Sequence, residues 1–361
     1  MIANINFGLN PVLTKENLFG DNIAKIEAYD FSTANLSDEH RLHAITSIAS
    51  ICYNNPKAIN SQSLYDRLYR ESKGLPSSSF EFIKMLIPVN LIIEKIIGEN
   101  NKNLLEYGNV NRCLKDHEYS MLNIFKFGTV LIVDGIEWVL TNYRAVVHDQ
   151  SKFNIDLTDF YNNGYQCNII KHFSYVFKIR MDTNTRTQFI RHRVAGYQEV
   201  SRRYVSGKRL AISFYEKENC NDIYSKYVLD DKRTGHSQAL EFTTTQVHEI
   251  VLNHYFTLLD NKVLPQDARR VLPQSMYTDL WVAFDYESFH NFKELRSNEH
   301  AQWEIRVVSE TMEEFVSKIK NSINFKIKKA DNFIIDKYTI KGIKWEIDVY
   351  FWYFLYLFLF L

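Results

Sequence analysis

The stretch Arg186–Arg209 reads RTQFIRHRVAGYQEVSRRYVSGKR and concentrates positive charge. It carries seven Lys and Arg residues and His192 against a single acid, Glu199, whereas the whole chain has a formal net charge of zero. A local excess of this kind indicates an anion-binding site. A solvated basic face and a nucleic-acid patch are the alternative interpretations.

The first half of this stretch is predicted to be helical. Residues 185–193 suit a helix, in which Gln188 and Arg191 lie three residues apart and Gln188 and His192 lie four apart. Their polar ends would then share one face. Gly196 is expected to break the helix, because glycine readily adopts non-helical backbone conformations.

The second half combines one acid with several hydrogen-bond donors. Glu199 and Arg203 are four residues apart and would pair if a further helical turn forms. Ser201 places a hydroxyl beside two guanidinium groups. Such a cluster fits a phosphate together with a planar polar ring.

Composition restricts the class of protein. The chain has 361 residues, of which 45% are hydrophobic, enough for a sizeable core in one or two domains. A pI near 7.2 argues against a protein that attracts nucleic acid through its overall charge. The four cysteines, Cys52, Cys113, Cys167 and Cys220, form no Cys-x-x-Cys pair, so reduced thiols and a cytoplasmic location are expected.

Neither end of the chain predicts membrane insertion. The N-terminal residues lack the charged start and apolar run of a signal peptide. The uncharged tail Val349–Leu361, VYFWYFLYLFLFL, is shorter than the roughly 20 residues that cross a bilayer as a helix. We therefore expect no membrane partner. The alternatives for the tail are a segment that packs or lies at an interface and an accident of the reading frame.

The basic stretch resembles a known signature. The tripeptide Arg191–Arg193, followed after seven residues by Ser201 and then by Arg203–Tyr204, is similar to the signature of the flavin-dependent thymidylate synthases. Glu199 also falls at that family's offset. The resemblance implies synthesis of dTMP from dUMP with FAD, NADPH and methylenetetrahydrofolate.

Three further segments extend the resemblance. Leu295–Arg296 followed by His300–Arg306, HAQWEIR, closely matches the family's other strong motif. The segment Asp267–Pro273, DARRVLP, resembles its A-R-x-V-L-P turn. Phe80–Ile83, after a serine-rich loop, is less closely similar to the family's turn that touches the flavin.

The chain departs from the family's pattern at several positions, and the Pro and the His of the flavin-contacting turn are missing around Phe80–Ile83. Gly196 stands where a serine is common, Gln198 where an asparagine is common, and Glu287 where an arginine is often seen. The change at Gly196 removes a hydroxyl, that at Gln198 keeps an amide with a longer reach, and that at Glu287 reverses a charge.

The implied fold class is α+β, with a central, mostly antiparallel sheet flanked by long helices. We expect an inserted helical element at residues 87–165, with a helix pair over Tyr119–Val147 bent near two glycines. The domain boundaries follow: 1–86 for the N-terminal part of the catalytic domain, 87–165 for the insertion, 166–325 for the catalytic core and 326–361 for a C-terminal extension.

Several other elements are predicted from periodicity and capping residues. These are helices from Ser37 to about Cys52, over Ser63–Lys73, over Gly235–Asp260 and from Pro265 to Pro273, and strands over Ile169–Met181 and Ala211–Tyr215. Within Met276–Ile319 the apolar spacing predicts one helix that ends near Arg296 and another that carries the chain onward. The long helix at 235–260 is expected to bury its apolar stripe.

The resemblance assigns roles to individual residues. Arg296 would face the uracil carbonyls and is the predicted catalytic residue. The expected nucleotide-binding residues are Gln188, Arg191, Glu199, Ser201, Arg203, Arg269 and Arg296. The expected flavin-binding residues are Ser79, His172, Arg191, His192, Arg193, Gln198, Glu199, Asn291 and His300, with Ser79 and His172 competing for one role.

The chain has no Gly-x-Gly-x-x-Gly motif, no P-loop and no Pro-Cys dipeptide. Cys220 lies among acids, where a thiolate is poorly stabilised. The resemblance instead implies FAD in a site shared between subunits of a homotetramer, with dUMP and folate as partners and no metal. The alternatives are a nucleotide- or nucleic-acid-binding module and a catalytically impaired flavin-binding relative.

Overall fold

The computed structural model describes residues 10–32, 37–70, 76–89, 91–92, 95, 123–133, 136–153, 164–217, 225–231, 236–321 and 327–329. The expected tail Val349–Leu361 and the predicted segments 96–122 and 154–163 lie outside these residues.

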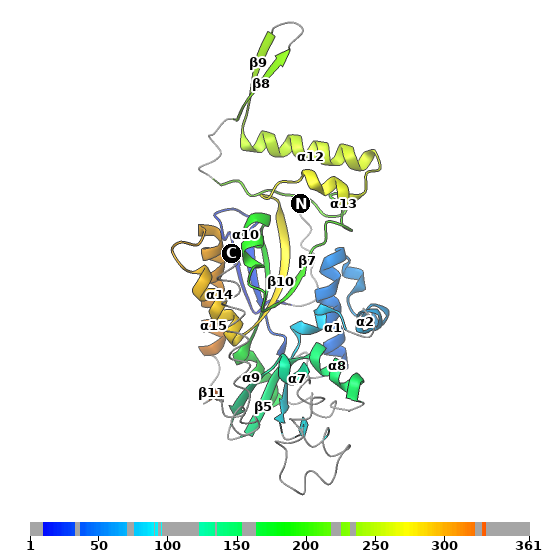
Figure 1. The fold of residues 1–361 in the computed structure, drawn as a ribbon, viewed down its shortest axis with the longest axis vertical. Coiled ribbons are helices and arrows are strands. Elements are labelled where there is room, and N and C mark those ends of the chain that lie inside the picture. The colour runs from blue at the N-terminus through cyan, green and yellow to red at the C-terminus, as the bar shows by residue number, and fades with distance from the viewer. Residues whose placement is uncertain are drawn as a thin grey trace, which may run out of the picture.

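The centre of the molecule is a five-stranded antiparallel sheet (Figure 1). Its strands run in the order β1 (Leu13–Glu16), β2 (Lys25–Tyr29), β6 (Ser174–Asp182), β10 (Tyr277–Asp285) and β7 (Gly196–Glu199). The two long central strands pair over their full length, from Tyr277 opposite Asp182 to Asp285 opposite Ser174. The α+β class predicted from the sequence is confirmed.

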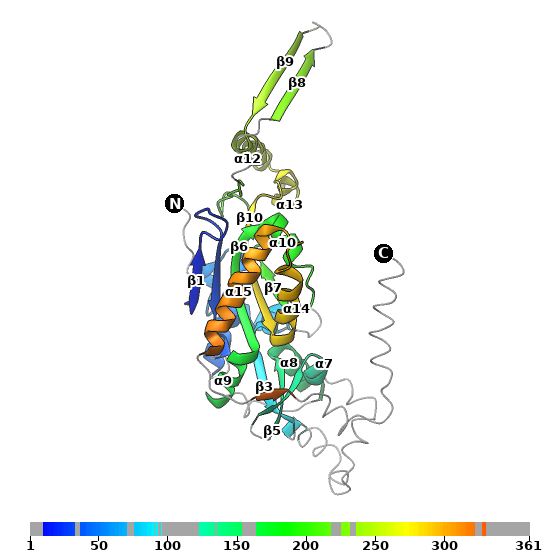
Figure 2. The ribbon, with the colours of Figure 1, turned by 90° about the vertical axis from the view of Figure 1, so that its left-hand side faces the viewer.

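Three helices cover one face of this sheet (Figure 2). They are α10 (Thr183–Phe189), α14 (Tyr286–Arg296) and α15 (Trp303–Asn321). Asp182 and Asp285 cap the first two, since each carboxylate accepts a hydrogen bond from a main-chain N–H in the first turn. The predicted division between two helices near Arg296 is confirmed. The rings of Phe189, Phe284 and Phe292 fill the core under these helices.

The other face packs against the N-terminal helices. Helix α1 (Asp38–Ser50) is capped by Ser37 as predicted, and α2 (Gln62–Tyr69) occupies the start of the second predicted helix. Short 3-10 turns follow at Ile51–Tyr53, Pro56–Ala58 and Ser78–Phe82. Trp281 is fully buried on this face, where its ring lies 4.5 Å from that of Tyr29.

The prediction that the segment 87–165 is helical is wrong, because part of it forms β-strands. A second antiparallel sheet runs in the order β11 (Ile327–Lys329), β4 (Thr129–Val133), β5 (Ile136–Asn142) and β3 (Lys84–Pro88). Helices α7 (Asn123–Lys126), α8 (Tyr143–Phe153) and α9 (Gly164–Phe173) accompany it. The segment contributes to the core, because Leu131, Trp138, Val139 and Leu140 are buried. Its domain boundaries stay a prediction.

One glycine explains why the predicted helix pair stops. Gly128 lies between α7 and β4, where an added Cβ would stand 2.4 Å from the carbonyl oxygen of Ile124 and 2.7 Å from the Val139 side chain. No side chain fits there, so the close approach of backbone requires glycine. The β-branched run that follows then continues as a strand.

The predicted helix at 235–260 begins later than expected. Residues 236–242 form β9 (His236–Phe242), paired with β8 (Ser225–Asp231), and α12 (Thr244–Asp260) starts at a capping box made by Thr243 and Gln246. The stripe of α12 is not all core, because Val247 and Ile250 are 37% and 50% exposed. In Figure 1 this helix lies across one end of the main sheet, with the hairpin projecting beyond it.

Two smaller predictions near this end can be compared with the structure. Helix α13 (Pro265–Ala268) has its proline at the first turn, as predicted, and a 3-10 turn at Arg269–Val271 ends before Pro273. The strand predicted over Ala211–Tyr215 is reduced to one bridge between Phe214 and Met276.

The strand predicted over Ile169–Met181 is correct only from Ser174 onward. Residues up to Phe173 belong to α9, so His172 lies in the last turn of a helix and not on the polar face of a strand. Within β6 the predicted apolar residues Tyr175, Phe177 and Ile179 are buried, but Val176 on the opposite face is buried as well, because both faces of this sheet are covered.

An ion pair on β6 and β10 predicts how stability depends on pH. Burial alone would raise the pKa of Asp279, but two hydrogen bonds of 2.7 Å from Arg180, with the charges of Arg180 and Lys178, hold that pKa below its usual value. The ionised pair therefore stabilises the fold above the unfolded-state pKa of about 3.9, and this contribution is lost as pH falls through the lower folded pKa.

We expect Asp279→Asn to lower the free energy of unfolding by about 1.5–3 kcal/mol at pH 7, because a charge-assisted bond to Arg180 is lost. The difference from the wild type should shrink as the pH falls below about 3.9, the unfolded-state value, and vanish once the pH is below the lower folded pKa, where the wild-type carboxyl also loses its charge. Urea unfolding at several pH values measures this. A difference that stays constant with pH would show that the pair contributes nothing through its charge.

Among the described residues, no helix is both long enough and apolar enough to cross a membrane.

Candidate active site

The two basic motifs meet on the helical face of the main sheet. Gln188, in the last turn of α10, donates a hydrogen bond of 2.5 Å from Nε2 to Oε1 of Gln302, just before α15. Asn184 donates to the same oxygen at 3.2 Å. The signature helix and the Leu295–Arg306 segment are therefore neighbours in one chain.

Arg191 and Arg296 bring like charges together at this junction. Burial and then the positive charge of Arg191 lower the pKa of Arg296, which still stays protonated because guanidinium does not deprotonate in proteins. The Nε of Arg296 is buried without a hydrogen-bond partner in the described residues. A partly buried guanidinium beside a second one is stabilised by an anion, so this pair is suited to a negatively charged ligand.

His192 lies near Arg296 and is buried. Its ring centroid is 5.7 Å from the rings of both Phe284 and Phe292, and its main-chain oxygen accepts from the Tyr197 hydroxyl. Burial, and to a lesser extent the charge of Arg296, lower the pKa of His192 although a hydrogen bond with the main chain of Ser288 opposes them. The ring is thus neutral near pH 7, and its Nε2 is a second buried atom without a partner in the described part of the chain. We call Gln188, Arg191, His192, Arg296 and Gln302 the Arg191–Arg296 cluster.

Glu199 does not pair with Arg203, and the second helical turn predicted there is absent. The segment Gly196–Glu199 is strand β7, and Glu199 instead accepts from Nε of Arg186 at 2.9 Å and from Oγ1 of Thr278 at 2.8 Å. Both carboxylate oxygens are therefore occupied. Arg186 and Thr278 were missed as functional neighbours, because their proximity depends on the pairing of β7 with β10.

Gln198 points to the opposite side of β7 from Glu199, since successive side chains of a strand alternate. Its Nε2 donates to Oγ of Ser78 at 2.6 Å and approaches Oγ of Ser79 at 3.5 Å, and its Oε1 accepts from Sγ of Cys52 at 2.9 Å. Two of the expected flavin-binding residues, Ser79 and Gln198, therefore lie side by side. Ser79 itself is buried.

Arg203 and Arg269 form another group, which we call the Arg203–Arg269 cluster. Nε of Arg203 donates to the side-chain oxygen of Gln266 at 3.3 Å, and Nε of Arg269 donates to the main-chain oxygen of the same residue at 3.3 Å. Both arginines are exposed. The Arg203 guanidinium also lies over the ring of Tyr204, 5.2 Å from its centroid. Ser201 is half-buried at the start of this turn.

The remaining predicted residues lie at the periphery. Arg193, Asn291 and His300 are exposed, and the side chain of His300 is 88% exposed beside Glu299. His172 packs edge-on against Phe173 at the end of α9, where burial and the charge of Lys320 lower its pKa. Their predicted flavin contacts stay predictions.

The departures from the family pattern have identifiable surroundings. At Gly196 an added Cβ would meet the Glu81 side chain at 3.4 Å and Phe82 at 3.5 Å, which are ordinary contact distances. A serine would therefore fit, and only its hydroxyl is lost. Glu287 is exposed in the first turn of α14, where a negative charge is favourable at a helix N-terminus.

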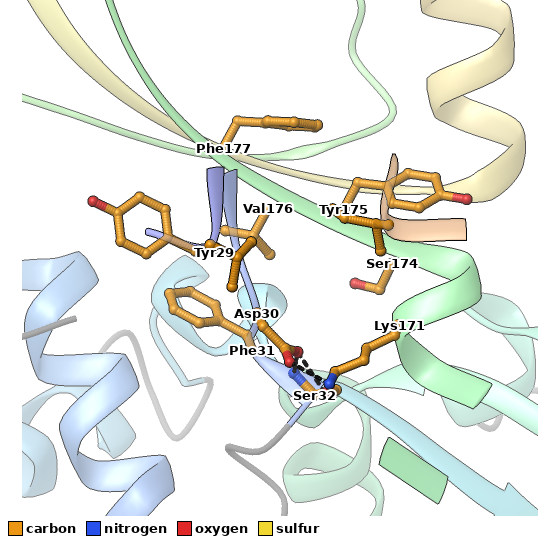
Figure 3. Close-up of a pocket in the computed structure, with 11 residues that line it drawn as sticks. Tyr29, Asp30, Phe31, Ser32, Lys171, Ser174, Tyr175, Val176 and Phe177 are labelled. Carbon is orange, nitrogen blue, oxygen red and sulfur yellow. Dashed lines mark hydrogen bonds and ion pairs between the residues drawn. The ribbon is translucent and has the colours of Figure 1, made fainter. Parts of the chain in front are cut away.

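A pocket of about 150 Å³ lies away from these clusters, between the end of β2, the start of β6 and α9 (Figure 3). Lys171 and Asp30 face each other in it and form an ion pair of 2.8 Å. Aromatic side chains make up much of its wall, among them Phe31, Tyr175 and Phe177. None of the residues predicted from the motifs lines it.

Within the described ranges, no group of three His, Cys, Asp or Glu side chains is placed to hold a metal ion.

Comparison with known proteins agrees with the motif positions. Residues 148–320 match the family model described as thymidylate synthase complementing protein. This range includes both basic motifs and the helices that join them. Residues 148–320 are thus similar to this family. The resemblance to flavin-dependent thymidylate synthases is confirmed at the family level.

Curated relatives named flavin-dependent thymidylate synthase are similar over the same region. The Saccharolobus solfataricus protein is 29% identical over 158 residues, covering 44% of this chain and 54% of the relative. The Pseudothermotoga lettingae protein is 32% identical over 139 residues, covering 38% and 58%. The Thermotoga neapolitana protein is 28% identical over 193 residues, covering 50% and 81%. The chain thus spans little more than half the length of the first two relatives.

Solved structures give a weaker likeness. A UMP/dUMP methylase, PolB from Streptomyces cacaoi bound with 5-Br dUMP, aligns at 23% identity and a TM-score of 0.32, covering 44% of this chain and 76% of that chain. The same protein bound with 5-Br UMP aligns at 25% identity and the same TM-score, covering 40% and 70%.

Proposed function

We propose that this protein is a flavin-dependent thymidylate synthase, which converts dUMP to dTMP with methylenetetrahydrofolate as carbon donor and NADPH as reductant through FAD. The observation that carries the proposal is the meeting of Arg191 and Arg296, from two separate motifs, with a buried Nε on Arg296 that lacks a partner within the described chain. The match of residues 148–320 to the family model supports it.

The residues present fit a bound flavin and a uracil ring. Arg296 offers an unused donor, and the neutral His192 offers a ring nitrogen without a partner in the described structure. Two unpaired polar atoms buried at one junction are costly unless a ligand satisfies them. A reduced flavin held there would supply the hydride needed for the methylation.

The chain's own side chains would position the substrate and stabilise charge. Arg296 would donate to the uracil carbonyls and stabilise the negative charge that develops as C5 becomes nucleophilic. The expected phosphate-binding residues are Gln188, Ser201, Arg203 and Arg269. Glu199 is held by Arg186 and Thr278, so it would fix the position of β7 beside the ligand and would not orient Arg203.

We further propose that complete sites form between copies of the chain in a homotetramer. The Arg191–Arg296 cluster and the Arg203–Arg269 cluster are held by different elements, α10, α14 and α15 on one side and α13 on the other. A neighbouring copy would supply the second cluster. Exposed apolar side chains at Val247, Ile250 and Leu264, beside α13, support a contact between copies. The separated cysteines support a cytoplasmic location.

The proposal is tested with the purified full chain and added FAD. We expect a yellow protein whose NADPH oxidation responds to dUMP, and rescue of a thymidine-requiring cell. A colourless protein that does not bind added FAD would contradict the assignment. Flavin binding without rescue would instead identify an impaired relative, consistent with the changes at Gly196, Gln198 and Glu287.

A nucleic-acid-binding module would behave differently. Its affinity for oligonucleotides would fall steeply with salt, and it would show little preference for dUMP. Arg209, exposed in the same basic stretch, would then contribute as much to oligonucleotide affinity as Arg191. The neutral overall charge of the chain argues against this alternative.

A further inference from the structure

A chain of hydrogen bonds joins a serine, a histidine and a glutamate near the start of β10. Nδ1 of His248 lies 2.9 Å from Oε1 of Glu216, and Nε2 of the same ring lies 2.8 Å from Oγ of Ser275. None of the three residues belongs to the clusters assigned to nucleotide or flavin.

The chemistry of the partners decides which atoms carry protons. An ionised carboxylate has no proton to donate, so Nδ1 of His248 must donate to Glu216. In the neutral ring Nε2 then has a lone pair and can only accept. The hydroxyl of Ser275 therefore donates its proton to Nε2. This is the arrangement of a nucleophile, a general base and a group that orients the base.

The histidine is held in this orientation from several sides. The ring of Phe214 stacks on it at 4.5 Å and an interplanar angle of 17°. The second carboxylate oxygen of Glu216 accepts from Oγ1 of Thr245 at 2.8 Å, which fixes the carboxylate. His248 is buried on α12, whereas Ser275 in the turn before β10 and Glu216 are both half-buried, so the two ends of this chain of bonds lie nearer the surface than the histidine.

We propose that Ser275 is an activated nucleophile and that Ser275, His248 and Glu216 form a second reactive site, able to hydrolyse small carboxylic esters. The site is independent of the proposed thymidylate synthesis. The proposal rests on the lengths of the hydrogen bonds from His248 to Glu216 and Ser275, and on the histidine tautomer that these bonds fix.

The reaction balances with water as the only co-reactant. Oγ of Ser275 attacks the ester carbonyl carbon while its proton passes to Nε2 of His248. The bond to the alcohol oxygen breaks, and the protonated ring returns the proton to the leaving alcohol. Water, deprotonated by the same nitrogen, then attacks the acyl-serine and releases the carboxylic acid, which restores the serine hydroxyl.

The test is labelling of the full chain with an alkyl fluorophosphonate, in which the serine oxygen displaces fluoride. We expect one adduct by intact mass, mapped by peptide sequencing to Ser275 and absent from Ser275→Ala. His248→Asn keeps an amide near the position of Nδ1, where it can donate to Glu216, but leaves no base at the position of Nε2 beside Ser275. It should slow labelling by about 100-fold or more, within the usual range for general-base catalysis.

Ser213→Ala removes a nearby half-buried hydroxyl outside this chain of bonds and should label like the wild type. If Ser275→Ala fails to fold, Ser275→Thr, which retains a hydroxyl, is compared by its labelling rate and its unfolding curve. Absence of any adduct, an adduct on another residue, or wild-type labelling of His248→Asn would overturn the proposal. Flavin binding and dTMP synthesis are measured separately, so their failure would leave this result unaffected.

Discussion

Arg296→Ala should lower kcat/KM for dUMP-dependent dTMP formation by roughly 10- to 150-fold. The substitution removes a charge-assisted hydrogen bond that we place on the uracil carbonyls, and such a bond contributes about 1.5–3 kcal/mol. The loss should fall mainly on kcat, because the negative charge it stabilises develops in the transition state. Steady-state assays of dTMP with varied dUMP measure the effect.

Two control variants separate this effect from a general loss of positive charge. Arg209→Ala removes an exposed cation from the same basic stretch and should leave kcat/KM within twofold of the wild type. Arg296→Lys keeps the charge but loses the planar fork of donors, so it should recover only part of the activity. Equal activities for Arg296→Ala and Arg209→Ala would remove Arg296 from its proposed role.

Phe292→Ala should lower the free energy of unfolding by about 3–5 kcal/mol. Phe292 is fully buried, and its ring centroid lies 4.6 Å from that of Phe189 and 5.2 Å from that of Phe284. The same ring supports His192 at 5.7 Å, so the cavity should also loosen the Arg191–Arg296 cluster. Urea unfolding followed by tryptophan fluorescence gives the free energy, and flavin affinity should fall in parallel.

Leu295→Ala on the same helix is the matched comparison. Leu295 is 56% exposed, so its removal should change the free energy of unfolding by no more than about 0.5 kcal/mol. If Phe292→Ala behaved like Leu295→Ala, the aromatic cluster would not be the core that positions His192.

The elements with strong end signals could be predicted from the sequence. Ser37 caps α1, Pro265 opens α13, and the break after Arg296 separates α14 from α15. Each signal depends on local hydrogen bonding at a helix end, which neighbouring residues determine. The basic stretch and the Leu295–Arg306 motif could both be found by their residue spacing, and the bond from Gln188 to Gln302 places them side by side.

The second sheet could not be predicted by periodicity alone. The runs at 129–133 and 136–142 are short and apolar, and such runs fit a buried strand as well as a buried helix. Their β-branched residues, and the close approach at Gly128, favour strands. The start of α12 was also missed, because residues 236–242 pair as a hairpin with β8, the strand just before them, and do not begin the helix.

The partners of Glu199 show which contacts at the candidate site could not be predicted from the sequence. A spacing of four residues suggested Arg203, which requires a helix, but β7 adds to the edge of the main sheet beside β10. That pairing carries Glu199 to Arg186 and Thr278 and turns Gln198 to Ser78 on the other face. Contacts fixed by sheet register depend on residues far apart in the sequence, so spacing within one segment cannot give them.

The most direct test of the shared site is the activity regained on mixing two inactive variants. Arg296→Ala damages the Arg191–Arg296 cluster, and the double variant Arg203→Ala with Arg269→Ala damages the other. If each site takes one cluster from each of two copies, half of randomly mixed pairs are heterologous and one of their two sites is intact. Unfolding and refolding the variants together should then restore roughly a quarter of wild-type dTMP synthesis. Activity no higher than the average of the two separate variants would contradict a site shared between copies.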